Sequence, residues 1–224
     1  MTDEARPEQV AEALRDVARL GGFFALDTPA TRDTDDGGGL RDGFAARARA
    51  VNDRFGTAEL RVGVSVAHLG LAARLWSPVL ACALLHGIVP TMSAVEWSGD
   101  GTDLRLTAPR GRLAERLPSP VEAVHAEVDD VLRDVEAGLS VKVAPGLLAG
   151  NSASALVGSA AQLLRTRPAL RGPLTRLTRE LLETGRLRGT GRITGPRLTF
   201  RRNSCCLFYR APGGGTCGDC CLTG

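Results

Sequence analysis

Five cysteines lie close together near the C-terminus. Cys205 and Cys206 are adjacent, and after ten further residues come Cys217, Cys220 and Cys221. Four cysteine thiolates are the usual donor set both for a structural zinc ion and for an iron–sulfur cluster. The two residues between Cys217 and Cys220 allow a chelating loop for either metal. The sequence therefore predicts a metal centre in this segment.

The adjacent pair Cys205 and Cys206 favours iron–sulfur over zinc, because zinc ligands normally come as two spaced pairs. In an extended strand, neighbouring side chains point to opposite sides. Both cysteines can therefore ligate only if the backbone bends there or if they reach separate iron atoms. Glycines in the intervening loop leave backbone N–H groups free to bond cluster sulfurs. We expect an iron–sulfur cluster, with a zinc site or no metal as the alternatives.

The residues around the cysteines, RRNSCCLFYRAPGGG followed by CGDC, resemble the C-terminal module of the FhuF-like ferric-siderophore reductase family. The resemblance is close over about residues 200–222 and weaker over 146–164, where LLAGNSASALVG is similar to a Gly-Asn-containing helix of that family's body. It implies a [2Fe–2S] cluster held by four ligands, Cys205, Cys206, Cys217 and Cys220. Cys221 departs from the family pattern, which often has proline there, and it is an alternative fourth ligand. We favour Cys220, because two intervening residues form the familiar chelate.

The same resemblance implies a one-electron reductase that converts Fe(III) in a ferric siderophore, of the hydroxamate type, to Fe(II). The sequence has neither a Gly-x-Gly-x-x-Gly motif after a strand nor a P-loop. We therefore expect no flavin or nicotinamide site, and a separate electron donor that is a ferredoxin-like protein or a flavoprotein. The alternatives are a non-enzymatic [2Fe–2S] protein for electron transfer or redox sensing, and a zinc-stapled binding module.

The net charge of +3 hides an asymmetry along the chain. Residues 165–224 contain twelve arginines against three acidic residues, which indicates an anionic partner for this region. Nucleic acid is not expected, because lysine is nearly absent, aromatic residues make up only 4 % and no nucleic-acid-binding motif is present. The arginines near the cysteines either form a solvated face or offset the charge of the thiolates and attract an anionic ferric chelate or an acidic electron donor. We favour the second role for Arg192, Arg197, Arg201, Arg202 and Arg210.

Other residues that could do chemistry have simpler explanations. Cys82 lies in an apolar run and is expected to be a buried free thiol. His68, His86 and His125 have no metal-ligand spacing, so we expect each to be a satisfied core or surface histidine. Trp76 and Trp97 either fill the core or line a cavity. No catalytic residue is expected beyond the cluster.

The remaining sequence predicts an α+β protein with a mostly helical body, a small β-hairpin and a C-terminal β/loop iron–sulfur appendage. The body covers residues 1–185 and would bind the siderophore, and the [2Fe–2S] module covers 186–224. The polar, acidic N-terminus lacks the pattern of a signal peptide, so we expect a cytoplasmic protein. No transmembrane segment is expected, although peripheral association with a membrane is compatible with the sequence.

Local patterns place the individual elements. Helices are expected at 40–54, 58–75, from Ser77 to Gly87, from Pro120 to Gly138, and over 146–164 and 173–183. The third helix would begin with Pro78 in its first position. Residues 23–26 are expected to form a short strand or the start of a buried extended segment, and residues 94–106 a β-hairpin.

Overall fold

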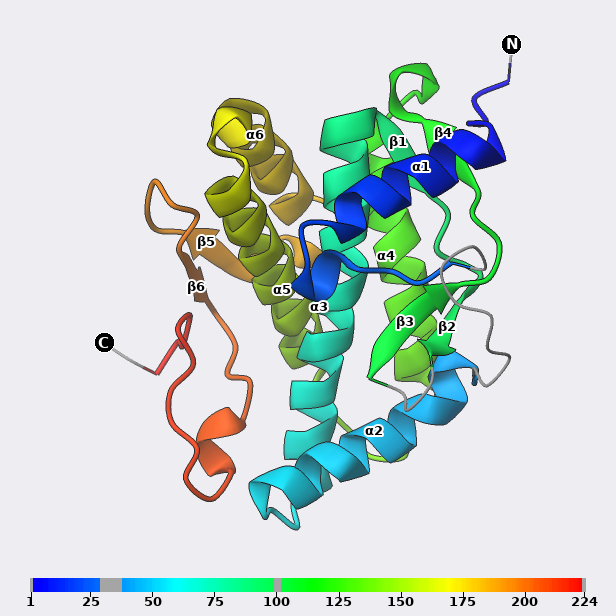
Figure 1. Cartoon of the computed structure of the whole chain (residues 1–224). Coiled ribbons are helices and arrows are strands. Elements are labelled where there is room, and N and C mark those ends of the chain that lie inside the picture. Colours follow the sequence, from blue (N-terminus) through cyan, green and yellow to red (C-terminus); the bar gives the residue numbers. More distant parts are fainter. Residues whose placement is uncertain (1, 29–37, 99–101, 223–224) are drawn as a thin grey trace.

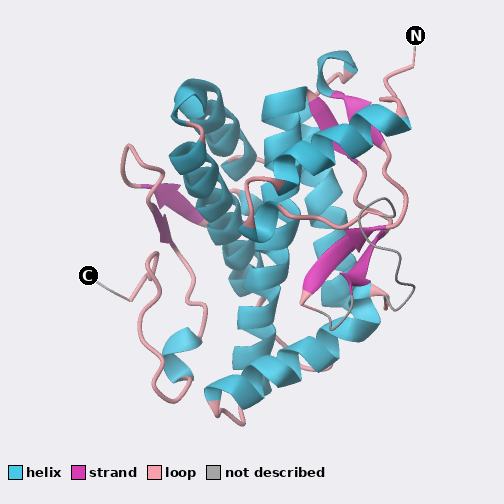
Figure 2. Cartoon of the chain, in the orientation of Figure 1, coloured by secondary structure: helices cyan, strands magenta, loops and turns pink. Residues whose placement is uncertain are grey.

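In the computed structural model, one long helix runs through the middle of a mostly helical fold (Figures 1 and 2). The structure describes residues 2–28, 38–98 and 102–222. The central helix is α3 (Leu60–His86), and its main neighbour is α5 (Pro145–Thr166). The other helices are α1 (Pro7–Ala18), α2 (Leu40–Phe55), α4 (Pro120–Ala137) and α6 (Arg171–Leu182). Short 3-10 turns lie at Gly22–Phe24, Ala114–Arg116, Pro168–Leu170, Gly185–Leu187 and Phe208–Arg210.

Three small antiparallel sheets complete the described part of the chain, each with two strands. β1 (Ile88–Pro90) pairs with β4 (Gly111–Leu113). β2 (Val95–Ser98) pairs with β3 (Asp103–Leu106) and forms the expected hairpin, with Val95 opposite Leu106. β5 (Gly191–Ile193) pairs with β6 (Phe200–Arg202) in a C-terminal hairpin beside α5. The α+β class with a mostly helical body is therefore confirmed.

The core lies where α3 meets α5 and α4. Side chains of Leu71, Leu75 and Trp76 on α3 are completely buried, as are those of Leu156 and Leu163 on α5. The predicted amphipathic face of α4 is also buried, through Val124, Val128, Leu132 and Val135. As expected, Ser119 caps this helix by accepting a hydrogen bond from the backbone N–H of Glu122 at 3.4 Å.

The prediction of two separate helices before Gly87 was wrong. α3 continues from Leu60 to His86 with Pro78 inside it, rather than restarting at Ser77. An interior proline removes a backbone hydrogen bond and costs a helix about 3 kcal/mol. The complete burial of Trp76, Val79 and Leu80 around it offsets that cost. The predicted end of the helix is confirmed, because Gly87 takes the left-handed conformation with φ of 63°.

The predicted strand at 23–26 is also wrong. Gly21 and Gly22 both have positive φ, and the chain turns there into a 3-10 helix at Gly22–Phe24. The extended pairing begins later, where Asp27 forms a parallel bridge with Arg105. The pair of glycines bends the chain directly before the apolar run of residues 23–26.

Both α3 and α5 are long and apolar enough, by length and composition alone, to cross a membrane. The most apolar window of α3 is 61 % buried within the fold, and that of α5 is 78 % buried. Such burial is typical of the core helices of a folded domain, so the two helices are weak evidence for a membrane span.

Candidate metal centre

The C-terminal segment, defined here as residues 203–222, runs along the outer side of α5 after the β5–β6 hairpin (Figure 1). Its one regular element is the short turn Phe208–Arg210. The ring of Phe208 packs edge-to-face on Phe55 at 5.2 Å between centroids. Arg210 forms an ion pair with Glu59 at 2.6 Å between Nε and Oε2. These contacts fix the turn that follows the cysteine pair against α2 and the start of α3.

The backbone bends directly after the adjacent cysteines. β6 ends at Arg202, and Leu207 adopts the left-handed conformation with φ of 65°. This conformation is unusual for a residue with a side chain and marks a sharp change of direction. It allows the backbone N–H of Leu207 to donate to Sγ of Cys205 at 3.4 Å. A bend is one of the two arrangements that would let both neighbouring cysteines ligate, and the structure has such a bend directly after the pair.

The second pair of cysteines forms a tight loop. The backbone N–H of Cys220 donates to the carbonyl of Cys217 at 3.1 Å, and the N–H of Leu222 donates to Sγ of Cys220 at 3.3 Å. The two loops meet where Sγ of Cys206 lies 3.5 Å from Sγ of Cys217. Cys206 and Cys220 are buried, whereas Cys221 is half-buried.

Two of the thiols have a raised pKa. Burial raises the pKa of Cys205, and burial together with hydrogen bonding to Asp219 and Cys206 raises the pKa of Cys217. A bound metal would have to displace those protons, since thiolates are the ligating form.

The donor set fits an iron–sulfur cluster by its chemistry. Five cysteines lie in one short segment, and Cys205 lies near enough to Cys206, Cys220 and Cys221 to interact with them electrostatically. Backbone N–H groups already point at two of the sulfurs, as second-shell donors do in such centres. Within the described residues, no three His, Cys, Asp or Glu side chains are arranged around one point that could hold a single metal ion.

A buried polar network fastens the cysteine pair to the core. The hydroxyl of Ser65 on α3 donates to the carbonyl of Cys206 at 2.7 Å. Nδ2 of Asn151 on α5 donates to the backbone carbonyl of Ser65 at 2.9 Å, and Oδ1 of Asn151 accepts from Nη2 of Arg202 at 2.8 Å. Arg202 is only 1 % exposed, so its charge is held inside the protein beside the segment that carries the thiols.

The second cysteine loop is attached to the same helix. Ser154 on α5 donates a hydrogen bond to the carboxylate of Asp219, which lies between Cys217 and Cys220. Gly150, one turn earlier, permits the close approach of the segment, because a Cβ there would overlap Oγ of Ser204. One face of α5 therefore positions both halves of the cysteine set.

The five arginines predicted to act electrostatically have different environments. Arg202 is buried in the network, and Arg210 is paired with Glu59. Arg201 donates to the carbonyl of Cys221 at 3.5 Å. Arg192 and Arg197 are exposed, Arg192 on β5 and Arg197 in the turn between β5 and β6. Only part of this set is therefore available to an external anion, and the role of each stays a prediction.

The C-terminal segment is similar to a known protein-family domain. Residues 202–222 match the model of the FhuF 2Fe–2S C-terminal domain. The predicted resemblance is thereby confirmed, and together with the clustered cysteines it points to an iron–sulfur cluster. No curated protein and no solved structure matches the chain.

The match to the FhuF 2Fe–2S C-terminal domain begins at Arg202, the last residue of β6. The boundary predicted at residue 186 stays a prediction, as do the four named cluster ligands and the choice between Cys220 and Cys221.

The other candidate residues belong to the folded body, although Nε2 of His125 is buried without a hydrogen-bond partner among the described residues. Cys82 is fully buried, and burial raises the pKa of its thiol to about 12, as expected for an inert free cysteine. His68 bonds Glu136 at 2.8 Å, and His125 is buried beside Asp129. Trp76 and Trp97 are buried too, and their indole N–H groups bond Ser152 and the carbonyl of Leu40. Both tryptophans therefore fill the core.

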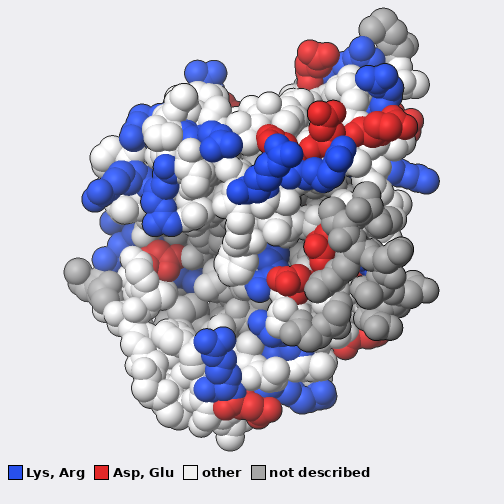
Figure 3. All heavy atoms as spheres, viewed as in Figure 1, with Lys and Arg blue, Asp and Glu red and all other residues white. Residues whose placement is uncertain are grey.

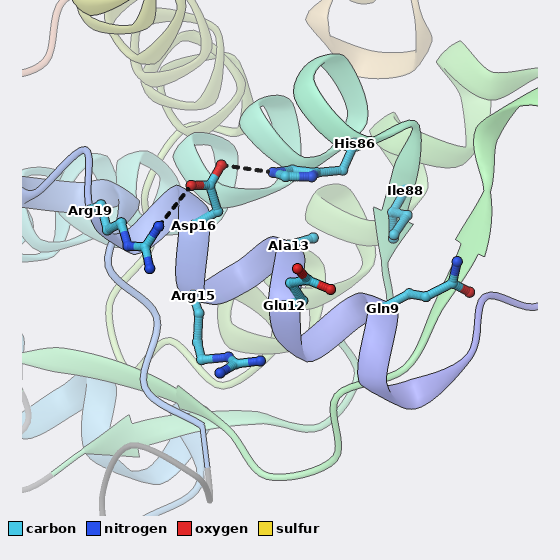
Figure 4. A pocket seen from close by; sticks show the side chains of 8 residues that line it. All are labelled: Gln9, Glu12, Ala13, Arg15, Asp16, Arg19, His86 and Ile88. Atoms are coloured by element: carbon cyan, nitrogen blue, oxygen red, sulfur yellow. Dashed lines mark hydrogen bonds and ion pairs between the residues drawn. The ribbon is translucent and has the colours of Figure 1, made fainter.

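One hollow lies far from the cysteines, between α1 and the C-terminal end of α3 (Figure 4). Its charged lining is mixed, with Asp16 bonded both to His86 at 3.1 Å and to Arg19 at 3.5 Å. His86 is at the opposite end of α3 from Ser65, a separation of about 30 Å along the helix. This hollow is therefore badly placed for chemistry at the cysteine segment.

Sequence reasoning missed the residues that hold the cysteine set in place, namely Ser65, Asn151 and Ser154. Small polar residues in an apolar helix carry no signature of their own. Asn151 offered a hint, because an asparagine inside a helix of small residues must find partners when it is buried.

Proposed function

We propose that the protein is a cytoplasmic iron–sulfur oxidoreductase that reduces Fe(III) held in a ferric siderophore. The single observation that carries this proposal is the match of residues 202–222 to the FhuF 2Fe–2S C-terminal domain, which contains the whole cysteine set. The ligands in this proposal are Cys205, Cys206, Cys217 and Cys220. The proposal also includes a separate protein electron donor and a hydroxamate-type siderophore.

A [2Fe–2S] cluster, when bound, supplies one electron at a time, which is the number that converts Fe(III) to Fe(II). The hard oxygen donors of a hydroxamate hold Fe(III) much more tightly than Fe(II), so the iron that gains the electron is released. The electron donor must replace the electron after each turnover. Electrons and iron therefore balance without an acid, a base or a nucleophile.

The chain's own contribution is to hold the thiolates and to place positive charge beside them. The network of Ser65, Asn151 and Arg202 fixes the backbone of Cys206 against the two core helices. The buried guanidinium of Arg202 would offset part of the negative charge of four thiolates, an effect that is stronger inside a protein than in water. Ser154 holds the loop of the second pair through Asp219.

The proposal is tested with the protein purified and kept under anaerobic conditions. We expect visible absorption that bleaches when dithionite is added, and that returns when a ferric trihydroxamate is mixed with the reduced protein. A ferrous-specific chelator should capture one Fe(II) per reoxidised chain. Bound zinc without visible absorption would support a zinc-stapled module instead. A cluster that stays reduced in the presence of the ferric complex would overturn the reductase function and leave an electron-transfer or sensing protein.

A further inference from the structure

Two hollows adjoin each other on the surface of α5. They share Gly158 and Gln162 and have volumes of about 540 and about 420 Å³. Each volume is within the range of small-molecule sites. We call the adjoining hollows the α5 groove, whose floor is formed by Ala155, Gly158 and Gln162.

One end of the α5 groove is basic. Arg165, Arg171 and Arg197 line it, and none of the three forms an ion pair with a carboxylate in the part of the chain that the structure describes. Nη1 of Arg171 donates to the carbonyl of Pro196 at 2.7 Å, which holds the β5–β6 turn and thus Arg197 over the groove. Figure 3 shows Lys and Arg side chains gathered on this side of the molecule, over α6 and the hairpin.

The other end of the groove is apolar. Leu20, Phe23 and Phe24 line it, together with Ala73 on α3. Phe23 is 46 % exposed and presents an accessible aromatic side chain at this end. The guanidinium of Arg74 stacks on its ring at 4.5 Å and keeps it in place. The groove thus offers an apolar wall to the body of a ligand and positive charge to an anionic group.

The α5 groove includes a residue one turn from the point where α5 holds the cysteine loop. Ser154, which bonds Asp219 between two of the cysteines, is one turn before Gly158 on α5. Residues four apart lie on the same face of a helix, separated by about 6 Å along its axis. The end of the groove at Gly158 therefore lies about one helical turn from the attachment point of the cysteine loop, whereas the hollow near His86 lies at the far end of α3.

We propose that the α5 groove binds the ferric siderophore and selects complexes that carry negative charge. This inference rests on the proposed function and names the substrate site and substrate class for it. Arg165, Arg171 and Arg197 would contact an anionic group of the ligand, and the apolar end would contact its hydrocarbon backbone. Of the arginines predicted from the sequence, only Arg197 belongs to this site.

Gly158 gives a sharp way to block the groove. It is exposed, and a Cβ added there would meet nothing within 4 Å. Gly158→Phe should therefore fill the groove without disturbing the fold. Gly146→Phe is the matched control, because Gly146 is also an exposed glycine of α5 with open space and lies outside the groove. Unchanged thermal unfolding and visible absorption would verify that both variants are intact.

Binding is measured by calorimetry with gallium(III) complexes, which keep the charge of the ferric complex but accept no electron. The probes are a linear trihydroxamate with a free terminal ammonium, which gives a cationic complex, and the same compound succinylated at that amine, which gives an anionic complex. We expect the anionic complex to bind at least about tenfold more tightly at low salt, with the difference shrinking as salt is added. Gly158→Phe should weaken binding at least about tenfold, and Gly146→Phe should leave it unchanged.

Arg165→Gln combined with Arg197→Gln should weaken binding of the anionic complex about fivefold or more while leaving the cationic complex unaffected. Equal binding of both probes, or full binding by Gly158→Phe, would overturn the groove assignment. Reduction assays on the ferric complexes separate this failure from that of the proposed function. Wild-type reduction by Gly158→Phe would contradict the groove alone. Binding of gallium complexes in the groove without reduction of the ferric ones would support the groove and contradict the reductase function.

Discussion

The helical core and the C-terminal segment are held together by different forces. Between α3 and α5, large apolar side chains such as Leu75, Trp76 and Leu156 are completely removed from water. In residues 203–222, three residues are buried, namely Cys206, Ala211 and Cys220. A segment with so little apolar burial depends on a few polar contacts and on whatever its cysteines bind. The core should therefore fold without metal, whereas the order of the segment should depend on it.

Removing the metal should give the largest difference between the two regions. We expect backbone amides of residues 203–222 to lose about 100-fold or more of their protection from hydrogen exchange in apo protein, because a ligand that binds only the ordered form stabilises that form. Amides of α3 and α5 should keep their protection. The measurement is hydrogen exchange followed by mass spectrometry on holo and apo protein. Equal loss in both regions would show that the two are one cooperative unit.

Asn151→Ala should break the attachment between the two regions. It removes the acceptor that lies nearest to the buried Arg202 guanidinium, at 2.8 Å, and hydrogen bonds to charged groups contribute about 1.5–3 kcal/mol each. We expect a loss of that size in the free energy of unfolding, together with faster loss of the cluster. Asn203→Ala is the matched control, since Asn203 is exposed and bonds only the carbonyl of Gly189 within the described chain. Denaturant unfolding that gives the same small loss for both variants would argue against the network.

Acid should weaken the core through His68. Burial lowers the pKa of His68, although its hydrogen bond to Glu136 acts in the opposite direction. Hydrogen bonds from His68 and Arg186 lower the pKa of Glu136 despite its burial. Below about pH 6.5 the unfolded chain therefore takes up a proton on His68 that the folded chain does not. The free energy of unfolding decreases as the pH is lowered.

For this one proton, the free energy of unfolding changes by up to about 1.4 kcal/mol per pH unit. Urea unfolding between pH 7.5 and pH 5.5 measures it, with values chosen to span about one unit either side of the ordinary histidine pKa. We expect His68→Gln to flatten the profile and His86→Gln, at the far end of α3, to keep it. An unchanged slope in His68→Gln would assign the pH dependence to other groups.

The smallest effect concerns the core alone. Ser119→Ala should remove the N-cap of α4 and cost about 1 kcal/mol. We expect a lower unfolding midpoint with an unchanged visible spectrum. Loss of the cluster signal in this variant would mean that the two regions are more strongly coupled than their contacts indicate.

Sequence patterns predicted the helices of the core and the cysteine set, and they did so for local reasons. In α4, for example, the apolar spacing and the N-cap can be recognised from residues close together in the sequence, namely Ser119, Val124, Val128 and Leu132. The continuity of α3 through Pro78 was not predictable, because it depends on burial by distant helices. The contacts of Ser65 with Cys206 and of Ser154 with Asp219 join residues far apart in the chain, and no local pattern reveals them.

The most direct test of the central claim is a count of iron and acid-labile sulfide in anaerobically purified protein, made on wild type and on two serine variants. We predict about two irons and two sulfides per chain in wild type. Cys221→Ser should keep both counts, and Cys220→Ser should lose them. Zinc in place of iron in the wild type would contradict the iron–sulfur centre, and loss in Cys221→Ser alone would overturn the assignment of the fourth ligand.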